Sequence, residues 1–198
     1  MPGLDERANI LVISASANVV NRLSEFFKKD GIAPPISADS AGNAKRILIE
    51  TDFDLVIIDT PLPDEDGAQF AMDLARSQSF EFSIIMLTKA DLYEQNLYQT
   101  ERMGIVTFKK PSDPRLLLQT IRLLLSFRVK IKKLESKADR LQQKLEDIRL
   151  VDKAKFLLVE KLKMSEQDAH YYIEKRTMDS CVKKTKVALE IINMYENT

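Results

Sequence analysis

The feature that most restricts the fold of this 198-residue chain is a long C-terminal stretch without glycine or proline. From Arg115 to the last residue the sequence contains neither. Because glycine and proline are the strongest local breaks of regular structure, this stretch is predicted to be helical throughout. Its first helix is expected from Arg115 to about Lys163, a length of about 75 Å at 1.5 Å of rise per residue. One small domain cannot cover so long a helix.

One face of this predicted helix carries apolar residues at alternating spacings of three and four. This a/d heptad pattern is typical of a coiled coil, and it predicts a parallel homodimer. An antiparallel pair, or a helix that folds back on the N-terminal region, remains the alternative. The predicted dimer seam consists of Leu124, Phe127, Ile131, Leu134, Ala138, Leu141, Leu145 and Ile148.

A short helical module is expected after the seam. Ser165 and Asp168 have the spacing of a capping box, so a second helix should start at Ser165. Asp179 and Ser180 offer a further N-cap, and we expect a third helix directly after them. Three short helices make a small core that needs support from the coiled coil or from a dimer mate.

The N-terminal region alternates strand-like and helix-like patterns. Strands are predicted at 10–13, 54–59, 83–88 and 104–109, and the two prolines in 33–38 favour a weak strand at a sheet edge. Such alternation indicates a parallel sheet of five strands, with five helices covering both faces. We therefore divide the chain into an α/β domain at 1–113, whose last helix continues to about 125, a connector at 114–148 and a helical module at 149–198.

Asp59 is the most informative single residue of the N-terminal region. It ends an apolar, β-branched run and is followed by Pro63 and Gly67, so it should lie at the carboxyl end of a strand. Open parallel sheets present reactive groups at this edge. Asp59 can accept a phosphoryl group or bind a metal there; the alternative is that it only caps the next helix.

Residues 8–125 resemble the receiver domain of bacterial two-component response regulators. The resemblance is carried by the spacing Asp-x-x-Leu-Pro-x-x-Asp-Gly from Asp59 to Gly67, by Thr88 and by Lys110 before Pro111. It implies a flavodoxin-like fold, a phosphoacceptor role for Asp59, switch roles for Thr88 and Lys110, and a histidine kinase as partner. Taken separately, Thr88 is also consistent with an ordinary strand-end hydroxyl and Lys110 with a solvated lysine.

The chain departs from this family at the first strand, where Ser14 and Ala15 replace the acidic pair that binds Mg²⁺. Mg²⁺ is usually held through one or two carboxylates, and Asp59 with hydroxyl and carbonyl oxygens is a poor substitute. We therefore assign no cofactor with certainty, and Mg²⁺ remains an option without its acids. Two versions follow: a receiver that is still phosphorylated weakly, or a degenerate receiver acting as a dimeric scaffold or ligand sensor. The aromatic switch position of the family also holds Thr107, with neighbouring Phe108 as an alternative.

Residues 135–195 resemble the ANTAR domain of transcription antiterminators. The matching positions are Ala154 with Lys155, Ala169, Thr177 with Met178, and Val187 with Ala188; Phe156 and Glu174 depart from the usual glycine and basic residue. The resemblance implies binding to hairpins in nascent leader RNA, which prevents a terminator from forming, and it implies no enzyme activity.

Basic residues of the helical module give partial support to RNA binding, because lysines can neutralise phosphates. Arg176, Tyr171 and Tyr172 are candidates for stacking on bases. One alternative is a merely solvated basic surface with core tyrosines. Another is a scaffold whose coiled coil and tail bind a partner protein rather than RNA. We expect no DNA binding because no recognition-helix signature is present. The candidate RNA-binding residues are Lys155, Lys175, Arg176, Thr177, Met178, Lys183, Lys184 and Lys186.

The net charge of zero conceals a division along the chain. Lys and Arg number 11 against 18 Asp and Glu in residues 1–113, 9 against 4 in 114–148, and 10 against 8 in 149–198. An acidic front and a basic back suggest different partners, a polyanion being usual for the basic part. A single cysteine, Cys181, excludes an internal disulfide, and no signal sequence or uncharged apolar span is evident, so we expect a cytoplasmic protein without a membrane anchor. His170 and Cys181 lack the neighbours of a metal site.

Overall fold

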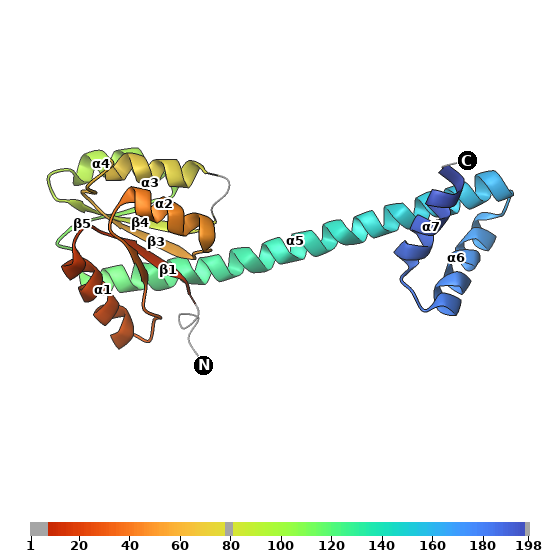
Figure 1. Ribbon diagram of the computed structural model, residues 1–198, viewed down its shortest axis with the longest axis horizontal. Coiled ribbons are helices and arrows are strands. Elements are labelled where there is room, and N and C mark those ends of the chain that lie inside the picture. The colour runs from red at the N-terminus through yellow and green to blue at the C-terminus, as the bar shows by residue number, and fades with distance from the viewer. Residues whose placement is uncertain (1–7, 78–80, 197–198) are drawn as a thin grey trace. The chain divides into compact units, whose positions relative to one another are not determined.

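The computed structural model describes residues 8–77 and 81–196 (Figure 1). The chain divides into two compact units, Met1–Lys132 and Lys133–Thr198. The long helix α5, Pro114–Leu162, contributes its first turns to the first unit and its last turns to the second. The helix expected from Arg115 to about Lys163 is therefore present.

The first unit contains a five-stranded parallel sheet with the strand order β2-β1-β3-β4-β5. The alternating pattern predicts the parallel sheet, and the resemblance to receiver domains implies this flavodoxin-like strand order. The proline-containing segment supplies the edge strand β2. The strands are β1 (Ile10–Ile13), β2 (Ile36–Ala38), β3 (Leu55–Asp59), β4 (Ser83–Lys89) and β5 (Val106–Lys110).

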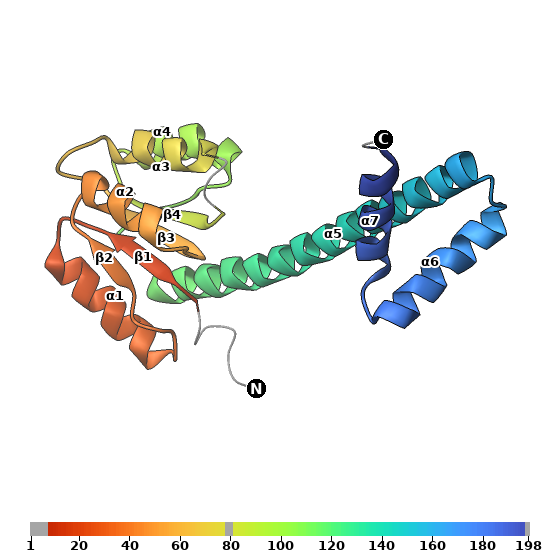
Figure 2. The ribbon, with the colours of Figure 1, turned by 45° about the vertical axis from the view of Figure 1, so that its right-hand side comes forward.

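Helices cover both faces of this sheet because the central strands are apolar on both sides. On one face, β1, β3 and β4 pack against α2 and α3 around Phe70; on the other, they pack against α1 and the start of α5 around Phe27 and Ile121. Figures 1 and 2 show α2, α3 and α4 on one side of the sheet, and α1 with α5 on the other. The helical elements are α1 (Ala17–Lys29), α2 (Ala41–Glu50), α3 (Gly67–Arg76), α4 (Tyr93–Thr100) and the 3₁₀ turn η1 (Glu101–Met103).

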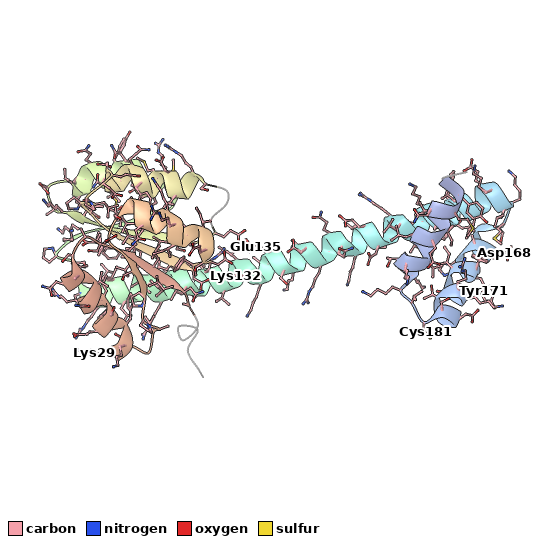
Figure 3. The ribbon with its side chains drawn as sticks, viewed as in Figure 1. Lys29, Lys132, Glu135, Asp168, Tyr171 and Cys181 are labelled. Carbon is pink, nitrogen blue, oxygen red and sulfur yellow. The ribbon has the colours of Figure 1, made fainter. Side chains whose placement is uncertain are left out.

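Two basic residues fasten α5 to the end of the sheet remote from Asp59. The buried side chain of Arg128 donates from Nη2 to Glu81 Oε2 at 2.9 Å, and Lys132 Nζ donates to Asp54 Oδ1 at 2.6 Å. Figure 3 labels Lys132 and Glu135, which lie on either side of the division between the units. The docked part of α5 therefore ends in polar contacts.

The second unit is a three-helix module made by the end of α5, α6 (Glu166–Ser180) and α7 (Lys184–Glu196). Ala154, Leu158, Ile173 and Ile191 are among the buried residues that form its core. Helix α6 starts after Ser165, whose hydroxyl accepts from the Asp168 N–H at 3.1 Å, as the capping pattern predicts.

The predicted start of the last helix was wrong. Asp179 and Ser180 lie at the end of α6 rather than before α7, which begins at Lys184. The chain turns at Cys181, which has a left-handed conformation with φ of 51°. The N–H groups of Cys181 and Val182 bond to the carbonyls of Met178 and Thr177, so they close α6 as a C-cap.

The predicted seam is solvent-exposed over most of its length in the single chain. Leu124 packs partly against the first unit, whereas Phe127, Leu134, Leu141 and Ile148 are exposed. Because successive helical residues are about 100° apart, residues two positions apart lie on nearly opposite sides. Phe156, eight residues after Ile148, is 64% exposed, while Ala154 is completely buried. Phe156 therefore lies on another side of α5 than the core of the three-helix module. The heptad positions that follow Ile148 are Asp152 and Lys155, so the apolar seam ends at Ile148.

In the described part of the chain, no helix has both the length and the apolar character needed to cross a membrane.

Candidate functional sites

Asp59 lies at the carboxyl end of β3 with only 6% of its surface exposed. Its two carboxylate oxygens have different partners. Oδ2 accepts a hydrogen bond of 2.7 Å from the hydroxyl of Ser14, which follows β1. Oδ1 accepts from Lys110 Nζ at 2.6 Å, at the end of β5. The structure thus brings Asp59, Lys110 and Ser14 together, and only the contribution of Ser14 was not predicted.

Lys110 is held by more than the carboxylate. Its ammonium group also donates to the carbonyl oxygen of Thr60, which follows Asp59. An ammonium group has three N–H donors, and these two contacts use two of them. Asp59, Lys110, the Ser14 hydroxyl and the Thr60 carbonyl form one polar cluster, in which the formal charges of Asp59 and Lys110 cancel.

The donor set around Asp59 does not fit Mg²⁺. This ion requires oxygen ligands in octahedral geometry and is usually held by carboxylates. Here Asp59 has a neutral hydroxyl on one side and a cation on the other. Within the described residues, no group of three or more His, Cys, Asp or Glu side chains is placed to hold a metal ion. Lys110 instead provides the positive charge that neutralises the Asp59 carboxylate.

Thr88, at the end of β4, lies on the neighbouring strand and is completely buried. Its hydroxyl accepts a hydrogen bond of 2.7 Å from the side-chain amide of Asn96 on α4. The Asn96 carbonyl in turn accepts from the Thr100 hydroxyl at 2.7 Å, and Thr100 shares a 2.8 Å hydrogen bond with Thr107. A buried polar chain therefore connects the predicted switch hydroxyl to β5 through α4.

The two candidates for the aromatic switch position lie on opposite faces of β5. Thr107 faces α4 and belongs to the polar chain just described, whereas Phe108 packs with the residues of α1 and α5. Thr107 therefore occupies the place next to α4, and Phe108 points to the other side of the sheet.

The loop after β3 is fixed by hydrogen bonds to backbone groups. Asp66 caps α3 by accepting from the Gln69 N–H at 2.8 Å. Asp64 accepts from the N–H groups of Ala41 and Gly42 at 3.0 and 2.8 Å, at the start of α2. These backbone donors hold the pKa of Asp64 below its usual value of 3.8. The loop is thus tied both to the helix that follows it and to α2.

In the second unit, a concave site of about 520 Å³ is lined by residues of α5, α6 and the start of α7. The predicted RNA-binding residues Lys155, Lys183 and Lys184 converge on it, together with His170. Asp147 and Asp152 lie at the same site. Because Lys155 meets the adjacent Lys183 and Lys184 from a distant part of the sequence here, the site can take a phosphate backbone.

Acidic neighbours divide the predicted basic residues into two groups. Lys155 pairs with Asp152 at 2.7 Å, and this hydrogen bond raises its pKa above 10.5. Lys184 pairs with Glu174 at 2.6 Å and lowers the pKa of that carboxyl below 4.5. Among the described residues, no ion pair is found for the exposed side chains of Lys175, Lys183 and Lys186. These three lysines are therefore free to meet a polyanion.

The aromatic and remaining predicted positions separate in a similar way. Tyr171 is 64% exposed on α6 (Figure 3) and shares a helix face with Lys175 and Met178, at spacings of four and seven residues. Tyr172 instead packs against the core, and its hydroxyl accepts from Arg176, which also pairs with Glu190. The Thr177 hydroxyl donates to the Ile173 carbonyl within α6. Only Tyr171 of the two tyrosines is available for stacking.

Comparison with protein families finds two matches that divide the chain. The profile of the response regulator receiver domain matches residues 10–122, and that of the ANTAR domain matches residues 139–192.

Individual relatives agree with this division. The transcriptional regulatory protein PdtaR of Mycobacterium tuberculosis is 27% identical over 180 residues, which cover 90% of this chain and 86% of that protein. Among solved structures, the chemotaxis response regulator CheY4 of Vibrio cholerae has a TM-score of 0.52 at 23% identity, over 59% of this chain and 98% of that one. The receiver domain of an HD domain-containing protein from Pseudomonas fluorescens has a TM-score of 0.56 at 24% identity, over 65% and 93% of the two chains.

Proposed function

The chain belongs to the response regulator receiver family and carries an ANTAR domain, and from this premise we propose that it is a cytoplasmic, RNA-binding transcription antiterminator. In this proposal it acts as a homodimer that binds tandem hairpins of a nascent leader transcript. Neither domain belongs to an enzymatic family, so its output is binding rather than chemistry.

The observation that carries RNA binding is the convergence of Lys155, Lys183 and Lys184 on one concave site of the second unit. The unpaired Lys186 lies on the same first turn of α7, where helix N–H groups add to the attraction for phosphate. RNA is commonly read through splayed bases that stack on aromatic rings, and Tyr171 offers an exposed ring on α6.

The exposed seam of α5 supports the homodimer. A single helix cannot cover the apolar side chains from Phe127 to Ile148, and a second copy of the same seam is complementary to them. Ile148, the last residue of the seam, also lines the lysine site, so pairing through the seam brings the partner helix to the edge of that site. Two linked modules then gain affinity for two hairpins through effective concentration.

We also propose that the receiver domain receives its signal without Mg²⁺-assisted phosphorylation of Asp59 by a histidine kinase. The support is the neutral Ser14–Asp59–Lys110 cluster, in which both carboxylate oxygens already have partners. Incubation with acetyl phosphate and Mg²⁺ should add no phosphoryl mass to the intact chain. A phosphoryl adduct that disappears in Asp59→Asn would restore the phosphorylated version of the mechanism.

The RNA proposal is tested by measuring affinity for a tandem-hairpin RNA as a function of salt. Lys183→Ala with Lys186→Ala removes two unpaired lysines, and we expect binding to weaken and the slope of log affinity against log salt to fall by about 1 to 2. Lys28→Ala with Lys29→Ala, which removes the same charge from exposed positions of α1, is the matched control and should leave both quantities unchanged.

A duplex DNA of the same length separates this function from general polyanion binding. Equal affinity for the DNA and the hairpin RNA would contradict antitermination. Absence of RNA binding in a folded dimer would instead favour the scaffold alternative, in which the seam and module bind a partner protein.

A further inference from the structure

A second concave site lies in the first unit, next to Asp59 but on the side of α1 and α5. Its volume is about 500 Å³, within the range of about 300 to 1,000 Å³ that is typical of small-molecule sites. It is formed between α1, the end of β4 and the segment that leads from β5 into α5.

The walls of this cavity are mainly apolar. Val19, Leu23 and Phe26 come from α1, and Leu117 comes from the first turns of α5. Leu23 and Leu117 are buried, and Val19 and Phe26 are half-buried against the same core. Side chains of this kind favour an apolar occupant, and a free phosphate ion would leave them uncovered.

The polar groups of the cavity are Asp59, Lys110, Arg22 and Ser112. Both oxygens of Asp59 already accept hydrogen bonds, from Ser14 and Lys110. Lys110 keeps one N–H donor, because its hydrogen bonds to Asp59 and to the Thr60 carbonyl use the other two. Arg22 is exposed, and no ion pair of its guanidinium is found among the described residues. One carboxylate and two cations leave the lining with an excess positive charge.

We propose that this cavity binds a small organic anion that has an aromatic or alicyclic body and one carboxylate. The apolar body lies between α1 and α5, and the carboxylate meets Lys110 and Arg22. Burying the body supplies most of the affinity, and the two cations fix its orientation. The proposal goes beyond RNA binding and does not depend on it, because the site lies entirely within the first unit.

Occupancy of this cavity connects a ligand to α5. The site includes Pro111, Ser112, Pro114 and Leu117, where the chain leaves β5 and enters the helix. A ligand that contacts these residues together with α1 stabilises the docked start of α5, in proportion to its concentration relative to its Kd. The same helix later supplies the seam and part of the lysine site.

The test uses the full chain and naphthalene-2-carboxylate as the probe, with titration followed by ¹H–¹⁵N NMR. For a probe of this size we expect saturable shifts of residues in α1 and early α5, with a Kd of about 1 mM. Naphthalene-2-carboxamide has the same shape without the charge, and it should bind at least about fivefold more weakly if the cations contribute.

Variants of α1 supply the specificity controls. Arg22→Gln should weaken the carboxylate about threefold to tenfold, whereas Lys28→Gln, the same change at an exposed position outside the cavity, should not. Val19→Phe should fill the cavity and abolish the shifts. Failure of the carboxylate to saturate by about 10 mM overturns the proposal, as does equal binding of the amide. Equal effects of Arg22→Gln and Lys28→Gln also overturn it. These results are obtained without RNA and leave the antiterminator proposal to its own test.

Discussion

Gly67 has no space for a side chain. A Cβ at this position would overlap the methyl group of Thr60, the residue after Asp59. Gly67→Ala should therefore displace the loop and lower the free energy of unfolding by about 1 to 3 kcal/mol, as overpacking usually does. Chemical denaturation of the full chain measures this.

Gly42→Ala is the matched control. An added Cβ there would lie 3.4 Å from Asp64 Oδ2, an ordinary contact, and alanine is the better residue within a helix. We expect a change between zero and about 1 kcal/mol of stabilisation. Equal destabilisation by the two variants would contradict the steric explanation.

Restoring the acidic pair tests the account of the metal site. Ser14→Asp with Ala15→Asp places carboxylates beside Asp59, so the double variant should gain a rise of Tm on addition of Mg²⁺. Without Mg²⁺ it should be less stable than the parent chain, because like charges then meet in a buried place. Asn18→Asp, at an exposed position of α1, is the control. A comparable Mg²⁺-dependent rise in the unmodified chain would show that the native residues already hold the ion.

Asp64 gives a pH dependence of known sign. Its pKa is lowered in the folded state, so the stability that it contributes is present above its ordinary pKa and is lost as the pH falls through the lowered value. The Tm of Asp64→Asn should therefore be below that of the parent chain at neutral pH, and the difference should vanish in strong acid. Asp91→Asn, at an exposed position of the described chain without a hydrogen-bond partner there, should show no such dependence.

The sequence predicts which residues lie at the ends of the strands, but it does not predict all the contacts between their side chains. Asp59 and Lys110 lie at the carboxyl ends of strands, and parallel pairing brings such ends to one edge. Ser14 lies at the same edge of the sheet. Nothing in the sequence indicates that its hydroxyl donates to Asp59 rather than simply replacing an acidic residue. The hydrogen bond from Asn96 to Thr88 depends on how α4 packs, which local sequence does not specify.

At the scale of the elements, the docking of α5 makes a prediction for local opening. Lys132 bonds to Asp54, which is half-buried, whereas the neighbouring Lys133 is exposed and outside this contact. Lys132→Ala should therefore increase amide hydrogen exchange in α5 around residues 124–132, by a few-fold because a partly exposed pair contributes little. Lys133→Ala should not, and equal exchange in the two variants would show that the Lys132–Asp54 pair does not hold the helix.

The helices of the C-terminal region show which boundaries a sequence reveals. The start of α6 was predictable because the side chain of Ser165 makes its own cap. The break after α6 was misplaced because Cys181, rather than a glycine, adopts the left-handed conformation that closes the helix. Lys163, directly after the end of α5, also has a left-handed conformation, with φ of 53°. Because neither residue is a glycine, local sequence gives no signal for a left-handed conformation at these two positions.

For the whole molecule, the main prediction concerns assembly. Leu141→Lys with Leu145→Lys places charges in the exposed seam and should convert a dimer into monomers in sedimentation experiments. RNA affinity should fall with it, by about tenfold or more if two modules act together. Gln142→Lys with Gln143→Lys adds the same charge at exposed neighbouring positions and should preserve the dimer. A monomeric parent chain would contradict the seam assignment.

The seam along α5 has a consequence for the RNA. A parallel homodimer formed through this face has a two-fold axis along the paired helices, so its two lysine sites are related by rotation. A transcript has a direction, and two successive hairpins repeat along it rather than rotate about an axis. One hairpin must therefore turn relative to the other before both are bound, and the single strand between them has to permit that turn. The spacing of the hairpins, and not only their loops, would then determine which transcripts are recognised.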